Sequence, residues 1–339
     1  MRLLVQTKGY KLFTPFFSGI GHILMFHRVC PESERPRIPF NTLMEVTPQY
    51  LEQTILFFKE QDYEFISMDT LYQRFKEKNF NKKFVVVTFD DGYMDNLIYG
   101  LPVFQKHQVP FTIYVSTNFP NHNAVLWWDL LEDVILERDQ IDITIDDQPL
   151  SFSCATMAEK EDTYSRIRSI IINFNESEFL EKIRSLFTVF VDNLYQKTKE
   201  SALSWEQILT LSQDPLVTIG AHTLNHYALK NLSTEHSRFE IYESKKEIES
   251  HIHTPVEHFA YPFGGFAEVG KKDLEITEAC GFKTAVATIP GNVFSGHQDT
   301  LFFLPRIQLY ETFDLTKIQL FIKGFTQFKL HKFKRIVTL

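Results

Sequence analysis

The sequence predicts an α/β fold built around a parallel sheet, either open or closed into a barrel. Amphipathic helical stretches, such as residues 48–61 and 233–251, separate most of its short apolar runs. Elements that alternate in this way favour a parallel sheet. The runs are rich in β-branched and aromatic residues, as buried strands are, and they cover residues 23–26, 84–89, 111–116, 216–219, 258–261, 284–287 and 303–308.

Composition favours a single domain that spans residues 1–339. The chain is 44% hydrophobic and 23% charged, so it can bury a large core, and no linker rich in Pro, Gly or Ser divides it. Residues 121–205 break the alternation, because a predicted hairpin, 141–144 with 150–153, precedes long polar helices. We interpret this segment as an insertion between two strands of the sheet.

Charge argues against nucleic acid as a partner. The net charge is −8, whereas binding to phosphate backbones needs clustered Lys and Arg. Residues 312–339 are the exception, since Lys, Arg and Phe mix between residues 317 and 334. We predict a surface helix followed by a solvated tail, with peripheral contact to a membrane as the alternative.

The cysteines and the N-terminal segment bear on location. Cys30, Cys154 and Cys280 are scattered and show no CxxC spacing, which is typical of thiols in a reducing compartment. Residues 12–26 are mostly uncharged, but Pro and Gly interrupt them and they are too short to span a membrane. No small-residue cleavage site follows. We expect a cytoplasmic location, with the membrane periphery as the alternative.

Two carboxylates follow the apolar run at residues 84–89. Asp90 and Asp91 stand side by side, directly before Gly92. Like charges at a strand end resist burial unless a cation or another partner compensates them, and active sites of parallel α/β proteins collect at the carboxyl ends of strands. The alternative is that both acids cap a following helix.

A second apolar run leads into His222 and His226. If a helical turn begins there, both imidazoles lie on one face and can bind one cation. A surface pair is an equal alternative for this spacing alone. Together with Asp90 and Asp91, however, the pair predicts a site of two His and one carboxylate with open positions, which is a catalytic arrangement. The other Asp would be free for proton transfer.

Two further features are weaker. Residues 261–264 form a Pro-aromatic-Gly loop after a predicted strand; such a loop can hold an aromatic wall beside a site, and it can equally be a plain turn. His27 ends the first apolar run, where a single His is more often a core residue.

These residues resemble a known family. Thr88-Phe89-Asp90-Asp91-Gly92, His222-Thr223-x-x-His226 and Tyr261-Pro262-Phe263-Gly264 are similar to successive motifs of NodB-type polysaccharide deacetylases, carbohydrate esterase family 4. The resemblance runs from about residue 23 to 309, without the insertion. It implies a distorted (β/α) barrel of about seven parallel strands, with the insertion as an added subdomain.

The resemblance also implies site roles. It makes Asp90 the catalytic base, and it makes Asp91, His222 and His226 the ligands of a divalent metal. Zinc is the expected ion, with cobalt, nickel and manganese as alternatives.

The chain departs from the family pattern at two places. Ala260 stands where the family usually has an Arg that orients the base, and Arg306 is the candidate replacement. The late Leu-x-His motif that supplies the acid is not recognisable; His27 is similar to an early strand-end His that some branches use as acid.

An aromatic substrate wall is expected next to this site. Trp127 and Trp128 stand near the place where the family has such a wall, and indoles stack on sugar faces. Tyr261, Pro262 and Phe263 are the other expected substrate contacts. The alternative is that the two Trp anchor the insertion to the barrel.

The expected function is removal of the N-acetyl group from an acetamido sugar in a polysaccharide or glycan precursor, for which a lipid- or nucleotide-linked sugar is favoured. Two alternatives stay open at this point. One is a metal-dependent amidase that acts on a non-sugar amide. The other is a non-catalytic glycan-binding protein on a decayed barrel, because the usual Arg and late His are missing.

Overall fold

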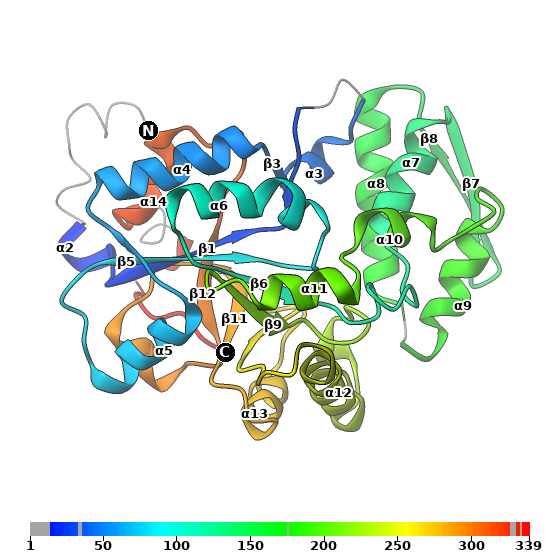
Figure 1. The fold of residues 1–339 in the computed structure, drawn as a ribbon. Helices are drawn as coiled ribbons and strands as arrows, with labels where there is room; N and C mark the ends of the chain where they lie inside the picture. The colour runs from blue at the N-terminus through cyan, green and yellow to red at the C-terminus, as the bar shows by residue number, and fades with distance from the viewer. Residues whose placement is uncertain (1–13, 33–35, 175, 326–329, 333) are drawn as a thin grey trace.

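The computed structural model describes residues 14–32, 36–174, 176–325, 330–332 and 334–339. Seven parallel strands form a closed barrel. The strand order runs from β1 through β12 to β5, and β1 pairs with β5 as well as with β12, which closes the ring. The expected (β/α) barrel is therefore confirmed (Figure 1). In ring order the strands are β1 (Gly21–Phe26), β12 (Leu304–Gln308), β11 (Thr284–Pro290), β10 (His258–Ala260), β9 (Val217–Ala221), β6 (Phe111–Val115) and β5 (Phe84–Phe89).

A short strand that the sequence pattern did not reveal, β4 (Glu64–Phe65), adds to β5 outside the ring. A parallel pair of two-residue strands, β2 (Arg28–Val29) and β3 (Glu45–Val46), was also missed. Elements this short carry no periodicity that a sequence pattern could show.

The barrel strands are buried on both faces, which explains their continuous apolar runs. Along β5, Phe84 and Val86 belong to the cluster inside the barrel, whereas Val85 and Val87 pack against the outer helices. Side chains alternate along a strand, so this pattern places Thr88, and then Asp90, on the inner side at the carboxyl end.

Helices cover the outside of the barrel. Helix α4 begins at Pro48 because Thr47 caps it, its hydroxyl accepting from the N–H of Tyr50. The remaining covering helices are α5 (Met68–Glu77), α6 (Leu101–His107), which follows the π-helical turn Asn96–Gly100, α11 (Trp205–Ser212), α12 (Thr234–Ile252), α13 (Lys271–Ala279) and α14 (Leu315–Ile322); α4 itself spans Pro48–Glu60.

The segment from α7 to α10, which lies between β6 and β9 in the chain, forms a separate lobe beside the barrel (Figure 1, right). Its hairpin turns at Asp146 and Asp147, both with positive φ, the conformation that such two-residue turns require. The lobe has its own hydrophobic cluster, which Ile38 joins from the loop region after β1. It contains α7 (Trp127–Leu136), β7 (Gln140–Ile145), β8 (Gln148–Ser153), α8 (Met157–Ile172), α9 (Glu176–Phe187) and α10 (Gln196–Ser201).

The C-terminal segment packs on the barrel through α14, in which Ile318, Leu320 and Ile322 are buried. Part of the basic run expected as a tail, residues 326–329 and 333, lies outside the described residues, so its contact with a membrane stays a prediction. Among the helices that the structure describes, none has the length and apolar character needed to cross a membrane. The three cysteines are free thiols.

Candidate metal and active site

Two strand ends bring the predicted ligands together at one rim of the barrel. Asp91 follows β5 with φ 76° and Gly92 with φ 82°, so the chain turns sharply as it leaves the strand. His222 follows β9 directly. The N–H of His222 donates to the carbonyl of Val115 at 2.9 Å, which ties this strand end to the neighbouring strand β6.

Asp91, His222 and His226 form a cluster that could hold one metal ion. Their ligand atoms all lie within 4.8 Å of one another. Oδ1 of Asp91 is 3.2 Å from Nε2 of His226 and 3.5 Å from Nε2 of His222. Nδ1 of His222 donates to the carbonyl of Ala260 at 2.8 Å, and Nε2 faces Asp91. Metal-bound histidines typically donate such a hydrogen bond from the ring nitrogen that does not bind the metal.

The His222–His226 spacing comes from a loop, so the helical turn expected there is wrong. Thr223 has φ 65° and His226 has φ 59°, values that no α-helix contains. Glu240, from α12, holds the loop by accepting from the N–H groups of Leu224 and Asn225 at 3.0 and 2.9 Å. The two imidazole rings still lie close, with centroids 4.9 Å apart.

The donor set fits a divalent cation. Oδ1 of Asp91 and Nδ1 of His226 are buried without a hydrogen-bond partner among the described residues, and an orphaned buried carboxylate oxygen is costly. Burial raises the pKa of Asp91, but His222 and His226 outweigh it and hold that pKa well below its usual range. Burial lowers the pKa of His226. An ionised carboxylate and neutral imidazoles are the forms that bind zinc.

Asp90 lies beside this cluster, paired with Arg306. Two parallel hydrogen bonds of 2.6 Å join the guanidinium to both carboxylate oxygens. Arg306 is fully buried in β12 and also donates to the carbonyl of Ala287 at 3.0 Å and to the hydroxyl of Thr88 at 3.2 Å. Burial raises the pKa of Asp90, but the charge of Arg306 more than offsets it, so that pKa lies below the usual value.

A cavity of about 290 Å³ opens over both groups. Phe263 and Trp128 flank His226, with ring centroids 4.7 and 5.2 Å from the imidazole. Nε1 of Trp128 donates to the hydroxyl of Tyr93 at 2.7 Å, which fixes the indole. Trp127 lines the cavity too, although it is mostly buried in the core of the lobe. The anchoring role and the wall role are therefore both compatible with its position.

The structure corrects the expectation for Tyr261 and Pro262. Tyr261 is fully buried, and its hydroxyl donates to the carbonyl of Phe302 at 2.9 Å. Neither residue is among those that line the cavity. Both stand too early in the loop after β10, where the side chains still belong to the barrel wall. Phe263, with φ 59°, is the residue that turns toward His226.

His27 lines the cavity and is half-buried. Its Nδ1 atom is buried and has no hydrogen-bond partner among the described residues. This position differs from that of a core histidine whose ring nitrogens are hydrogen-bonded.

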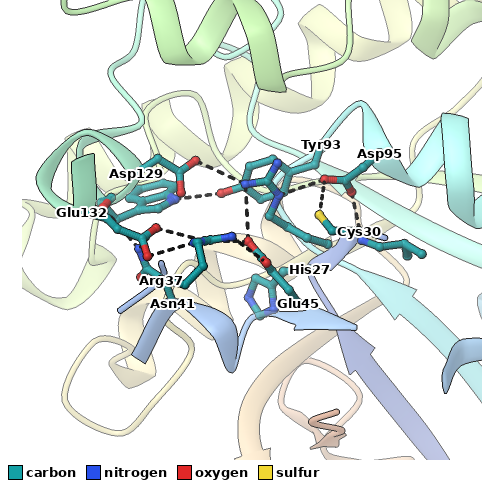
Figure 2. Close-up of polar contacts among 12 residues, drawn as sticks. His27, Cys30, Arg37, Asn41, Glu45, Tyr93, Asp95, Asp129 and Glu132 are labelled. Atoms are coloured by element: carbon teal, nitrogen blue, oxygen red, sulfur yellow. Dashed lines mark hydrogen bonds and ion pairs between the residues drawn. The ribbon is translucent and has the colours of Figure 1, made fainter. Parts of the chain in front are cut away.

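A polar wall that sequence reasoning missed closes one side of the cavity (Figure 2). Arg37 makes hydrogen bonds of 2.9 Å to both carboxylate oxygens of Glu132 and one of 2.8 Å to Glu45. Arg28 donates to Asp95 at 2.8 Å. The contacts of Arg37 with Glu132 join the segment after β1 to α7 of the lobe, and the contact of Arg28 with Asp95 joins it to the segment after β5.

Asp129 belongs to the same wall. Burial raises its pKa to about 6, although Arg28, 3.7 Å away, acts in the opposite direction. Its Oδ2 atom has no hydrogen-bond partner among the described residues. The wall residues are scattered over the chain and form no motif, so no sequence signal could have found them.

The polysaccharide deacetylase family profile matches residues 77–144 and 176–285; these 68 and 110 residues are more than half of the chain. The YxkH protein of Bacillus subtilis (strain 168), a candidate polysaccharide deacetylase, is 29% identical over 89 residues. That alignment covers 26% of this chain and 30% of YxkH, so it spans less than a third of the relative.

Solved structures show the same fold at low identity. The deacetylase PplD of Streptococcus pyogenes, solved in complex with acetate, has a TM-score of 0.59 at 18% identity, over 89% of this chain and 97% of that one. A polysaccharide deacetylase from Bacillus cereus has a TM-score of 0.55 at 18% identity, over 89% and 68%. A de-N-acetylase from Aggregatibacter actinomycetemcomitans has a TM-score of 0.55 at 14% identity, over 89% and 99%.

The profile match covers the strand ends that carry Asp90, Asp91, His222 and His226, and the closed parallel barrel is the fold that these solved proteins share. The chain belongs to the polysaccharide deacetylase family.

Proposed function

We propose that this protein is a metal-dependent hydrolase that removes the N-acetyl group from an acetamido sugar. One observation carries the proposal: Asp91, His222 and His226 converge beside the paired Asp90 at the rim of a single cavity. The proposed catalytic set needs no arginine at position 260, because Arg306 donates from β12 to both carboxylate oxygens of Asp90. This geometry argues against a decayed site.

Asp91, His222 and His226 would hold the ion. One carboxylate oxygen and two imidazole nitrogens suit zinc, and they also accept cobalt, nickel or manganese. Such an ion, when bound, polarises an amide carbonyl and increases the acidity of water.

Asp90 would act as the general base. Its carboxylate is ionised and held in one orientation by Arg306, so it can accept a proton from water as the water oxygen attacks the acetamide carbon. The carbon–nitrogen bond then breaks. The products are acetate and an amino sugar whose nitrogen has gained a proton.

His27 is the proposed donor of that proton, because it lines the cavity with an unpartnered ring nitrogen. The change His27→Ala should lower kcat by about 10²- to 10⁴-fold, the usual contribution of a positioned general acid. Steady-state acetate release, with metal content measured on the same samples, checks this. Wild-type turnover in the variant would exclude His27 as the acid.

The overall proposal is tested by acetate release from purified protein loaded with zinc or cobalt. N-acetylated mono- and oligosaccharides should yield acetate and a free amine in equal amounts. Linear and cyclic non-sugar amides serve as the comparison. Release from those amides alone would indicate an amidase, and glycan binding without any release would indicate a non-catalytic protein.

A further inference from the structure

The lobe contributes a cation to the cavity that the reaction above does not use. Arg168 lies on α8 and lines the same cavity as Asp90, Asp91 and the two histidines. It is half-buried. Its guanidinium therefore stands where a substrate that reaches the rim of the barrel would also contact the lobe.

Arg168 differs from the other arginines of the cavity wall in its partners. Arg28 and Arg37 are committed to carboxylates, with contacts of 2.8 Å to Asp95 and 2.9 Å to Glu132. Within the part of the chain that the structure describes, Arg168 makes no ion pair and no hydrogen bond. Two groups act on its charge from a distance, the hydroxyl of Tyr164 and the carboxylate of Glu268.

The charge of Arg168 is consequently uncompensated at close range. Burial lowers the pKa of its guanidinium, and Tyr164 and Glu268 only partly offset this. A guanidinium stays protonated at neutral pH even so. A desolvated cation without a close counter-charge gains most when a ligand supplies one.

The guanidinium is also held in place. Its central carbon lies 4.7 Å from the ring centroid of Phe40, a cation–π contact. The Phe40 ring packs in turn against Tyr164, with centroids 5.7 Å apart. An arginine stacked in this way presents its planar edge to a ligand and loses little freedom on binding.

We propose that Arg168 is a specificity residue that binds an anionic group of the substrate. The proposal rests on the proposed function, and it narrows the substrate class to acetamido sugars that carry a carboxylate or a phosphate near the acetamide. Both anions accept two parallel hydrogen bonds from a guanidinium. Such an anion can be the carboxylate of a neighbouring uronic acid or the phosphate that links a sugar to a lipid or nucleotide.

Three probes separate these sources: the methyl glycoside of N-acetylglucosamine, which is neutral, uridine diphosphate N-acetylglucosamine, and a disaccharide of N-acetylglucosamine and glucuronic acid. Trp127 and Trp128 line the cavity, so their fluorescence reports binding to metal-free protein without turnover. Acetate release from zinc-loaded protein gives kcat/KM for the same probes. Wild type should prefer one charged probe, and the preferred anion identifies the source.

The change Arg168→Gln should lower binding and kcat/KM for the charged probe by about 10- to 100-fold, the range of a lost charged hydrogen bond. Both values for the neutral glycoside should stay within about twofold. Arg166→Gln is the matched control, because Arg166 is on the same helix and lies 4.8 Å from the Phe152 ring but does not line the cavity. Arg166→Gln should leave binding and kcat/KM unchanged for both the charged probe and the neutral glycoside.

Equal affinity of wild type for charged and neutral probes would overturn the role of Arg168. So would an equal loss for both probes in Arg168→Gln, since that indicates a structural effect on the cavity. Selective binding of a charged probe without acetate release would instead support the role of Arg168 and contradict the proposed deacetylation, so the two failures are distinguishable.

Discussion

Replacing Asp91 with alanine should remove bound metal and activity together. Asp91 supplies the only carboxylate of the three-residue cluster found among the described residues, and the remaining two imidazoles leave a cation poorly neutralised. Loss of a residue that merely orients a ligand already costs about 10- to 100-fold in metal affinity, so loss of the ligand should cost at least as much. His222→Ala should behave in the same way.

Asp90→Asn is the matched control for the metal ligands, because it neutralises the adjacent carboxylate and keeps its shape. Activity should fall by about 10²- to 10⁴-fold, as expected for a lost general base, while metal content stays at the wild-type level. Metal analysis of dialysed protein and acetate release from the same samples check both results. Full metal occupancy in Asp91→Ala would show that the ligand assignment is wrong.

Breaking the buried pair of Asp90 and Arg306 should have the largest effect on stability. Arg306 has no exposed surface and Asp90 is 2% exposed, so Arg306→Met leaves a buried carboxylate without its counter-charge. Removal of one partner of a buried pair costs about 3–5 kcal/mol of unfolding free energy. Asp90→Leu combined with Arg306→Met should recover much of this loss, because no unpaired charge is left.

The unfolding free energy lost in Arg306→Met should depend on pH in a defined direction. In the wild type the pKa of Asp90 is lowered, so the pair stabilises the fold above the ordinary Asp pKa of about 3.9 and this contribution disappears as pH falls through the lowered value. In Arg306→Met, burial without the guanidinium should raise the pKa of Asp90, so the penalty is absent below the ordinary Asp pKa, grows as pH rises from there to the raised value, and is complete above it. The difference should therefore be largest near neutral pH and shrink toward pH 4.

Urea unfolding of metal-free protein at several pH values measures this difference. Arg166→Met is the control, since it breaks the exposed pair of Arg166 with Asp162, whose side chains are 60% and 68% exposed; such pairs contribute little. A loss in Arg306→Met that is no larger than in this control, or that does not change with pH, would contradict the assigned role of the buried pair.

Prediction from the sequence succeeded where a pattern is local. The apolar runs that become β1, β5 and β9 are visible because both faces of each strand are buried. Asp90 and Asp91 follow β5, His222 follows β9, and parallel strands in one sheet bring their carboxyl ends to the same rim. The metal cluster could therefore be predicted although Asp91 is more than a hundred positions from the two histidines.

Prediction failed where a side chain's direction depends on distant contacts. Tyr261 and Phe263 are two residues apart in the same loop, yet Tyr261 enters the core and Phe263 reaches His226. The loop from His222 to His226 is shaped by Glu240, which belongs to a helix that begins later in the chain. Neither outcome follows from spacing.

The sequence by itself determined the barrel strands and the residues at their ends, because burial and strand direction act on neighbouring positions. The sequence offered Arg306 as a candidate partner of Asp90, but only the tertiary structure decided that the two side chains form a buried pair with two hydrogen bonds. Only the tertiary structure also decided that Arg168 of the lobe lines the same cavity without an ion pair among the described residues. The physical reason is that the compensation of a buried charge depends on distance in space, and the chain sets that distance only when it closes the barrel and packs the lobe against it.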